Sequence, residues 1–359
     1  MRIGGDLPVA STLGRGGRPG NGFETRAPED LAVLAELGLT DVRIGLDWFR
    51  MQPQPGGLDD DWREWYQATI DAARGAGLSV WLTLWDGAVP PWFEDEGGFS
   101  DDSTSGRWWP RWVELAADLF GDRVDGWFPM EDPVSHAASF ADDALRHRRA
   151  LTNTVVGWRD AWRILRGGPP VASSLGLRIV RPADGTLPAR DAARREDELR
   201  WRLWLGAWRD GEIALPGLPV REVQDLAGSL DLLGVGLVRD LGGAESRLGS
   251  EPDAAATEWG ERVGTMVRRA ADEGPERPVL VSSLALRWPD DDDRRLLIEA
   301  FGRALVDVTT DGIVIEGAWY SPAIDPTTDR PDRQDGLLDR DRNVRPSAMA
   351  WTGLRAAIP

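Results

Sequence analysis

The stretch GWFPMEDPVSHAA, residues 126–138, joins a predicted strand to a pair of charged side chains. Its first five residues are apolar, as expected for a strand that is buried in a covered parallel sheet. Glu131 and Asp132 follow, and Pro133 then ends the strand because proline has no backbone N–H to donate to a neighbouring strand. Two adjacent carboxylates at the end of a buried strand therefore indicate both the type of sheet and the position of a site.

The same pattern extends along the whole chain, with short apolar runs alternating with longer amphipathic ones. Residues 28–38, 60–77 and 111–121 have helical patterns, with acidic residues near the start and glycine at or near the end. Strand–helix alternation repeated eight times predicts a single (β/α)8 TIM barrel, one domain over residues 1–359. The predicted strands are 1–9, 41–48, 78–85, 125–130, 171–180, 230–238, 277–286 and 311–320.

The composition excludes several classes of function. The 359 residues include 60 acidic and 42 basic side chains, a net charge of −18, which disfavours nucleic acid and anionic membranes as partners. All basic residues are arginine, so no lysine is available for Schiff-base chemistry. There is no cysteine, and His136 and His147 are the two histidines, too few for a three-histidine zinc site. We expect no cofactor. The first residues lack an apolar signal core, so we expect a cytoplasmic protein.

Function in a barrel of this kind is located on the loops that follow the carboxyl ends of the strands. Asp86 follows the third predicted strand, and Glu131 and Asp132 follow the fourth. Glu131 and Asp132 are candidates for binding or proton transfer, with solvated loop carboxylates as the alternative. The 19 tryptophans fit sugar stacking or core packing, and those in residues 106–112 fit packing within a loop. The candidate substrate-binding residues are Arg43, Asp47, Trp48 and Asp86.

Three segments resemble glycoside hydrolase family 1, the β-glucosidase family. Residues 34–53, LAELGLTDVRIGLDWFRMQP, are similar to its Arg-Phe-Ser-Ile-Ser-Trp-x-Arg segment. Residues 120–133, FGDRVDGWFPMEDP, resemble its run ending in Thr-Phe-Asn-Glu-Pro, and residues 277–285, RPVLVSSLA, its strand ending in Ile-Thr-Glu-Asn-Gly. These matches keep the chain order of the family, so the resemblance implies the same barrel.

The resemblance also shows where this chain departs from the family. The family retains configuration by using one Glu as nucleophile and another as acid/base, with carboxyl groups roughly 5–5.5 Å apart. The acid/base position falls on Asp132, the preceding Asn on Glu131, and the nucleophile on Ser283. The His-Trp pair that binds the sugar falls on Asp86 and Gly87, whereas Arg43 and Trp48 keep the family residues. A serine cannot replace a nucleophilic carboxylate without a base, and retracting the acid by a methylene can cost roughly 100-fold.

Three hypotheses follow. The first is a carbohydrate- or glycoside-binding pseudo-glycosidase with a degenerate catalytic pair. The second is an active O-glycosyl hydrolase with a rebuilt carboxylate pair among Asp86, Glu131 and Asp132. The third is a divalent-cation site formed by Asp47, Asp86, Glu131 and Asp132; we assign no metal. In each case Arg43 is expected beneath the four carboxylates as their main cationic partner.

Overall fold

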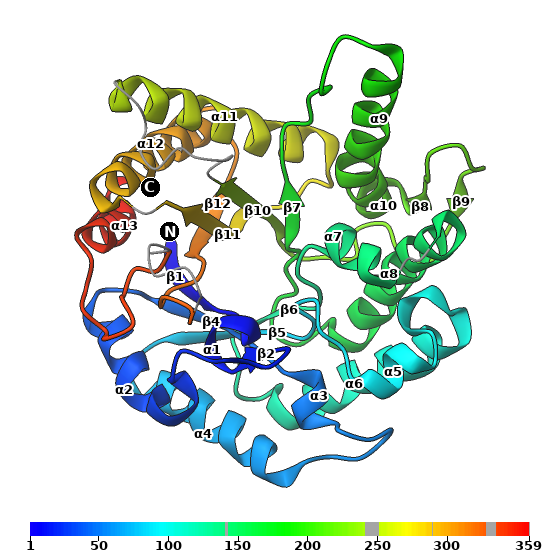
Figure 1. Ribbon diagram of the computed structural model, residues 1–359, viewed down its shortest axis with the longest axis horizontal. Coiled ribbons are helices and arrows are strands. Elements are labelled where there is room, and N and C mark those ends of the chain that lie inside the picture. The colour runs from blue at the N-terminus through cyan, green and yellow to red at the C-terminus, as the bar shows by residue number, and fades with distance from the viewer. Residues whose placement is uncertain (141–142, 241–250, 289, 328–334, 359) are drawn as a thin grey trace.

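The computed structural model describes residues 1–140, 143–240, 251–288, 290–327 and 335–358. Eight parallel strands surround a central axis, and the longer helices form a ring outside them (Figure 1). This confirms the predicted (β/α)8 barrel. Every predicted strand overlaps an observed one. Six observed strands lie inside the predicted ranges, whereas β10 and β11 run past them, to Asp240 and Arg287. The barrel strands are β1 (Arg2–Leu7), β4 (Asp41–Gly45), β5 (Ser79–Thr83), β6 (Gly126–Phe128), β7 (Leu175–Leu177), β10 (Leu233–Asp240), β11 (Val279–Arg287) and β12 (Ile315–Tyr320).

The order of the strands around the barrel follows their order in the chain. The continuous sheet runs β6-β5-β4-β1-β12-β11-β10-β7. Its two ends meet through a parallel bridge between Trp127 and Val171, where the Trp127 N–H donates to the carbonyl of Pro170 at 2.9 Å. A second bridge joins Ala172 to Leu232 on the other side of the same segment. Closure leaves no exposed sheet edge, and all carboxyl ends of the strands point to one mouth.

The helices differ from the predictions mainly at their starts. The helix predicted at residues 28–38 begins at Phe23, and Arg26 lies outside helical geometry just before Pro28. Residues 106–112, predicted as a loop, lie inside α6, because their tryptophans occupy one face of an amphipathic helix. The helices are α1 (Val9–Thr12), α2 (Phe23–Glu36), α3 (Trp48–Met51), α4 (Asp60–Gly75), α5 (Pro91–Asp95), η1 (Gly98–Ser100), α6 (Asp102–Phe120), α7 (Pro133–Ala137), η2 (Ala138–Phe140), α8 (Ala144–Leu165), α9 (Leu187–Asp197), η3 (Glu198–Arg202), α10 (Leu203–Asp210), α11 (Pro252–Glu273), α12 (Asp291–Thr310) and α13 (Pro346–Ala357).

Two short hairpins lie outside the barrel sheet. β2 (Gly14–Arg15) pairs with β3 (Arg18–Pro19) in antiparallel fashion, within the glycine-rich segment that follows α1. β8 (Glu212–Ile213) pairs with β9 (Arg221–Glu222) after α10. The first hairpin matters for the site because it contributes arginines to the barrel mouth.

The interior of the barrel is filled by large aromatic side chains that need glycine opposite them. Trp81 and Trp319 meet edge to face with ring centroids 5.4 Å apart. A Cβ atom at Gly126 would lie 2.1 Å from the Trp81 ring, and one at Gly4 would lie 2.3 Å from the Trp319 ring. The same small core cluster is completed by Phe128, Ala172, Leu232 and Leu280.

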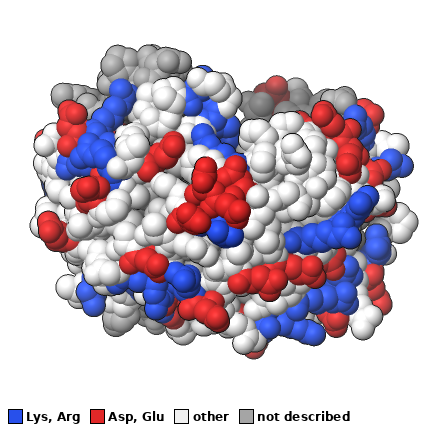
Figure 2. Space-filling model, turned by 90° about the horizontal axis from the view of Figure 1, so that it is seen from below, with Lys and Arg blue, Asp and Glu red and all other residues white. Residues whose placement is uncertain are grey.

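Charged side chains of both signs cover the outer surface. On the face in Figure 2, acidic side chains gather near the centre and arginines stand beside them. No described helix combines the length and the apolar character needed to cross a membrane.

We predict that Gly126→Ala destabilises the protein by about 1–3 kcal/mol, because the added methyl group has to displace the buried Trp81 ring. The free energy of unfolding from denaturant titration measures this. Gly106→Ala is the matched control, since Gly106 is exposed in α6 and no atom lies within 4 Å of the added carbon. Equal stability of Gly126→Ala and wild type would contradict the tight packing inferred for the barrel interior.

Candidate functional site

Arg43 lies at the centre of the barrel mouth and connects four strands or the loops that follow them. It projects from β4 and is 1 % exposed. Its Nε donates to Thr83 Oγ1 at 2.6 Å, and Nη1 donates to the Ser282 carbonyl at 3.0 Å and to Ser174 Oγ at 3.3 Å. The guanidinium carbon stands 4.3 Å from the centroid of the Phe128 ring. A buried guanidinium needs nearby anions to offset its lost hydration.

Glu131 and Asp6 are those anions. Arg43 Nη2 donates to Glu131 Oε2, and its Nε lies 3.7 Å from Asp6 Oδ1. Burial opposes the charge on Arg43, but the two carboxylates outweigh this effect and raise the arginine pKa. Ser174 donates to the same Glu131 oxygen, and its Oγ lies 2.7 Å from Ser282 Oγ. Glu131 is thus tied into the barrel centre rather than free in a solvated loop.

Asp6 was not among the residues singled out from the sequence. It lies near the end of β1, is 5 % exposed, and accepts a hydrogen bond from Ser321 Oγ at 2.6 Å. Burial raises its pKa from 3.8 to about 6; Arg43 lowers it, and the neighbouring Glu131 raises it further. The one sequence signal was an acidic residue inside the otherwise apolar run IGGDLPV, read as part of a strand.

Asp132 directly follows Glu131 and has an unusual backbone conformation. Its φ is 28° and its ψ 63°, which is strained for a residue with a Cβ atom. The backbone is held there by the Asp132 N–H, which donates to the Ser174 carbonyl at 2.8 Å. Asp132 Oδ1 is buried without a hydrogen-bond partner among the described residues. A Cβ atom on the facing residue, Gly176, would lie 2.6 Å from the carboxyl carbon.

Arg200 is the cation beside Asp132. Its Nη1 lies 3.9 Å from Asp132 Oδ2 and donates to the Gly176 carbonyl at 3.1 Å. Arg200 belongs to η3, a π-helical turn, and such turns occur often at functional sites. Glu196, one turn earlier, accepts from Arg200 Nε and fixes the side chain. Arg200 was not singled out from the sequence, because it lies neither directly after a predicted strand nor in a segment that resembles the family.

Asp86 and Asp47 have other cationic partners. Asp86 accepts from Arg15 Nη2 at 2.6 Å and from the Val9 N–H at 3.0 Å, so it fastens α1 and the β2–β3 hairpin to the barrel. Asp47 caps α3 by accepting from the Arg50 N–H at 3.1 Å, and its pKa is raised mainly by burial. The prediction that Arg43 lies beneath all four carboxylates is therefore wrong for direct contacts. Arg43 contacts Glu131 and Asp6, whereas Asp86, Asp47 and Asp132 lie beside Arg15, Arg50 and Arg200, which come from other segments.

Ser283 lies within β11 instead of at its end. The strand continues to Arg287, and the register with β10 shifts so that Val235 pairs with Val281 but Gly236 pairs with Ser283. Ser282 is the extra residue of this irregularity, and Ser283 is 6 % exposed. Bulges of this kind are common beside active sites because they turn a side chain toward the mouth.

Trp48, predicted to bind substrate, lies in the hydrophobic core. It is 1 % exposed and stacks on Trp112 of α6 with ring centroids 5.5 Å apart. Twelve tryptophans are exposed by less than 2 %, which accounts for most of the high tryptophan content as core packing. Trp48 stands at the position of the tryptophan in the sequence motif. Its ring is covered by protein and is therefore not exposed to a ligand.

Among the residues that the structure describes, no three histidine, aspartate or glutamate side chains converge on a point that could hold a metal ion. The divalent-cation hypothesis for Asp47, Asp86, Glu131 and Asp132 therefore gains no support.

A closed (β/α)8 barrel with carboxylates and arginines at the carboxyl ends of its strands is the architecture of the barrel glycosidases. The family model described as Glycosyl hydrolase family 1 matches residues 13–142. Thermostable beta-glucosidase B of Thermobispora bispora is 27% identical over 92% of this chain and 70% of its own length. Raucaffricine-O-beta-D-glucosidase of Rauvolfia serpentina is 32% identical, over 29% of this chain and 20% of its own length.

Solved structures agree in fold. The beta-glycosidase from Pyrococcus horikoshii superposes with a TM-score of 0.82 at 17% identity, covering 99% of this chain and 94% of that one. Beta-glucosidase from Thermotoga maritima in complex with glucoimidazole gives 0.80 at 15% identity, covering 99% and 97%. Over residues 13–142 the chain is therefore similar to glycosyl hydrolase family 1, and over nearly its whole length it shares the fold of these glycosidases.

We predict that Asp6 makes stability depend on pH in a way that Asp6→Asn removes. Between pH 3.8 and about 6 the folded protein holds a proton at Asp6 that the unfolded chain has lost. The stability gained from this proton is present below the unfolded-state pKa and disappears as the pH rises through about 6. From pH 3.5 to 7, wild type should therefore lose up to roughly 3 kcal/mol relative to Asp6→Asn.

Urea unfolding of both proteins across this pH range is the measurement. Asp272→Asn, which changes an exposed carboxylate on the outer surface, is the control and should follow wild type. Parallel stability profiles for wild type and Asp6→Asn would show that Asp6 titrates alike in the folded and unfolded states.

Proposed function

We propose that this chain is a one-domain glycoside-binding barrel that has lost the retaining hydrolysis of its family. The observation that carries the proposal is the state of the two catalytic positions. The nucleophile position, carried over from the family motif, is Ser283, a hydroxyl at the bulge of β11. The acid/base position is Asp132, one methylene shorter than glutamate and placed beside Arg200.

The charges around Arg43 support the same proposal. A buried arginine at the mouth would be balanced by a nucleophilic carboxylate on β11 if there were one. Here Asp6 contacts it from β1, and Glu131 contacts it from the loop after β6. Reintroducing a carboxylate at position 283 alone would add a third anion to a balanced centre. The loss of the nucleophile is thus compensated within the fold, which is expected of a site kept for binding.

The ligand class comes from the relatives. Structures similar to this chain include Thermotoga maritima beta-glucosidase in complex with glucoimidazole and with deoxynojirimycin. We propose that the present chain binds a small carbohydrate or glycoside at the barrel mouth. Calorimetric titration with glucoimidazole and a panel of aryl β-glycosides tests this. Saturable binding to at least one of them is expected, and an absence of heat with every compound would refute the ligand class.

We predict that a mechanism-based reagent that traps a glycosyl-enzyme leaves the mass of the protein unchanged, because Ser283 offers no carboxylate to attack the anomeric carbon. Intact-protein mass spectrometry is the measurement, with an active β-glucosidase of the family labelled in parallel as the control. Ser283→Glu combined with Asp132→Glu should remain inactive, since Asp86 and Gly87 replace the sugar-binding His-Trp pair. Stoichiometric labelling of wild type at any residue would overturn the loss of retaining chemistry.

A second candidate is an active O-glycosyl hydrolase with a rebuilt carboxylate pair among Asp86, Glu131 and Asp132. Inversion requires one acid and one base, about 6.5–9.5 Å apart, and no nucleophile on β11. The observation that favours it is Asp6, whose pKa of about 6 suits a proton donor near neutral pH and which shares Arg43 with Glu131.

Slow hydrolysis of an aryl glycoside with inversion, seen by NMR of the first-formed sugar, would favour this second candidate. In that case we predict that Asp6→Asn or Glu131→Gln lowers kcat by at least about 100-fold, the range expected for loss of general acid or base catalysis. Asp47→Asn is the control, because Asp47 is occupied in capping α3. Equal rates for all three variants would remove Asp6 and Glu131 from the chemistry.

A further inference from the structure

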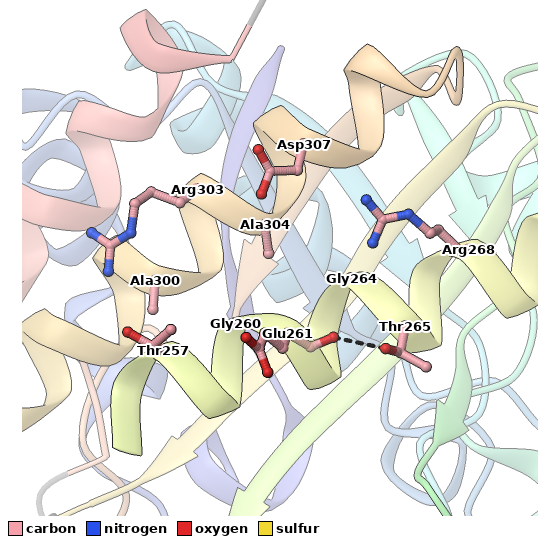
Figure 3. Close-up of a pocket in the computed structure, with 10 residues that line it drawn as sticks. All are labelled: Thr257, Gly260, Glu261, Gly264, Thr265, Arg268, Ala300, Arg303, Ala304 and Asp307. Atoms are coloured by element: carbon pink, nitrogen blue, oxygen red, sulfur yellow. Dashed lines mark hydrogen bonds between the residues drawn. The ribbon is translucent and has the colours of Figure 1, made fainter. Parts of the chain in front are cut away.

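A groove of about 430 Å³ runs along the outside of the barrel between α11 and α12 (Figure 3). Its floor is made of small residues, because the two helices approach each other closely there. A Cβ atom added at Gly260 would lie 2.9 Å from the carbonyl oxygen of Ala300, so these two residues lie side by side. This contact fixes the positions of the residues along one helix relative to those along the other.

The charged residues on the rims of the groove stand in opposite order on the two helices. Along α11, Glu261 comes before Arg268, whereas along α12, Arg303 comes before Asp307. Figure 3 shows both helices running in the same direction across the view, from Thr257 to Arg268 below and from Arg303 to Asp307 above. Each rim therefore carries both signs of charge, in the reverse order of the other rim.

Three of these four charges have no ionic partner within the part of the chain that the structure describes. Glu261, Arg303 and Asp307 are exposed and form no ion pair there. Opposite charges four residues apart on a helix can pair, but in Figure 3 the guanidinium group of Arg303 extends away from Asp307. Arg268 is different, because its Nη2 lies 2.7 Å from Asp311 Oδ2.

A two-fold axis across α12 would convert this order of charges into complementarity. If a second copy packs on this face with its helices antiparallel, an axis near Leu305 places Arg303 of one copy opposite Asp307 of the other. The reverse contact forms by symmetry, because a two-fold interface uses the same surface on both copies. One substitution in the sequence therefore changes this interface twice.

The same axis pairs the charges of α11. It crosses that helix near Thr265, close to the midpoint between Glu261 and Arg268, so the carboxylate of each copy meets the guanidinium of the other. Arg268 is already held by Asp311, so this contact orders one flexible side chain instead of two, and the entropy cost is smaller. The groove as a whole is thus complementary to itself.

The net charge of −18 opposes association between two copies of this chain. The groove is a place where that repulsion is small, because its lining contains two arginines and two acidic residues. Complementary charges at the rim of an interface mainly fix orientation and suppress wrong pairings. Apolar surface has to supply most of the free energy of association.

An apolar hollow on the other side of α12 supplies such surface. A cavity of about 500 Å³ lies between α12 and α13 and shares Arg303 and Asp307 with the groove. Since the proposed axis crosses α13 as well, the hollow of one copy would face the hollow of the other. Its remaining lining is mostly small or apolar: Gly302, Val306, Ala350, Gly353, Leu354 and Ala357.

The face is large enough for a specific interface. The three helices have 22, 20 and 12 residues. With a rise of about 1.5 Å per residue and helix axes about 10 Å apart, they present roughly 750 Å². A standard protein–protein interface buries about 800 Å² on each partner.

We propose that the outer face of α11, α12 and α13 binds a second copy of this chain, about a two-fold axis that crosses the three helices. The inference goes beyond the proposed glycoside-binding function and does not depend on it, because the face lies on the helix ring. In the dimer the helices of the two copies are antiparallel, so the two barrel mouths point in opposite directions and both stay open.

Sedimentation velocity of the full chain over a range of concentrations tests the proposal. Wild type should reach twice the mass of the single chain. Arg303→Asp and Asp307→Arg should each raise the dissociation constant of the dimer at least about tenfold, because each replaces two attractive contacts by two repulsive ones.

Mixing the two variants should restore association. Arg303→Asp leaves two aspartates on this part of α12, and Asp307→Arg leaves two arginines, so a dimer with one copy of each variant regains both attractive contacts. An equimolar mixture should dimerise within about threefold of wild type, although each variant alone does not. The double variant Arg303→Asp/Asp307→Arg should also dimerise, since it exchanges the two charges without changing their complementarity.

Asp118→Arg is the matched control. Asp118 is exposed on α6, on the opposite side of the barrel in Figure 1, and the substitution changes the net charge by the same amount as Asp307→Arg. This variant should dimerise like wild type. Circular dichroism of every variant checks that the fold is intact.

Three results would overturn the proposal. A wild type that stays monomeric at every concentration would show that this face is covered by a different partner or by solvent alone. Dimerisation unaffected by either charge reversal would place the interface elsewhere on the chain. Loss of the dimer in both variants without recovery on mixing would rule out the two-fold pairing of Arg303 with Asp307. None of these measurements involves a sugar, so they leave the proposed glycoside binding untouched.

Discussion

The arrangement at the barrel mouth depends on one buried charge, the guanidinium of Arg43. A cation with 1 % exposure is tolerable only if anions and hydrogen-bond acceptors replace the water it has lost. Thr83, Ser174 and Ser282 supply uncharged acceptors from three other segments, and Glu131 and Asp6 supply the charges. Because its partners come from different strands, Arg43 fixes the relative positions of these strands at the mouth.

The charge of Arg43 is balanced without a carboxylate from β11. Its anionic partners are Glu131, which follows β6, and Asp6 on β1, the strand on the other side of β12. The backbone features of the site are nevertheless present. Asp132 keeps a strained conformation, and Ser283 follows a bulge, both of which cost free energy and are typical of functional sites. Together with the buried charges, these features support the proposal that the mouth binds a ligand.

The fold was predictable because strand and helix patterns are local. Apolar runs such as residues 78–85 are buried on both faces in a parallel sheet, so they remain recognisable without knowledge of their neighbours. The site was predictable only in part. Glu131 was a candidate because it directly follows a predicted strand, and in the structure it contacts Arg43. Asp6 and Arg200 were missed. Asp6 is a single charge inside an apolar run, and Arg200 lies in a helical segment rather than directly after a strand.

The sequence by itself determined the barrel and the family resemblance, since these follow from the order of residues along the chain. It did not determine which charges meet. Asp86 pairs with Arg15, a residue of the β2–β3 hairpin that is far from Asp86 in the sequence. The folded chain brings the two side chains together. The same holds for Trp48. The motif predicted a substrate-binding side chain, whereas in the structure Trp48 stacks on Trp112. Pairing of long side chains and burial of large ones are decided by the three-dimensional neighbourhood, because both depend on contacts between residues far apart in sequence.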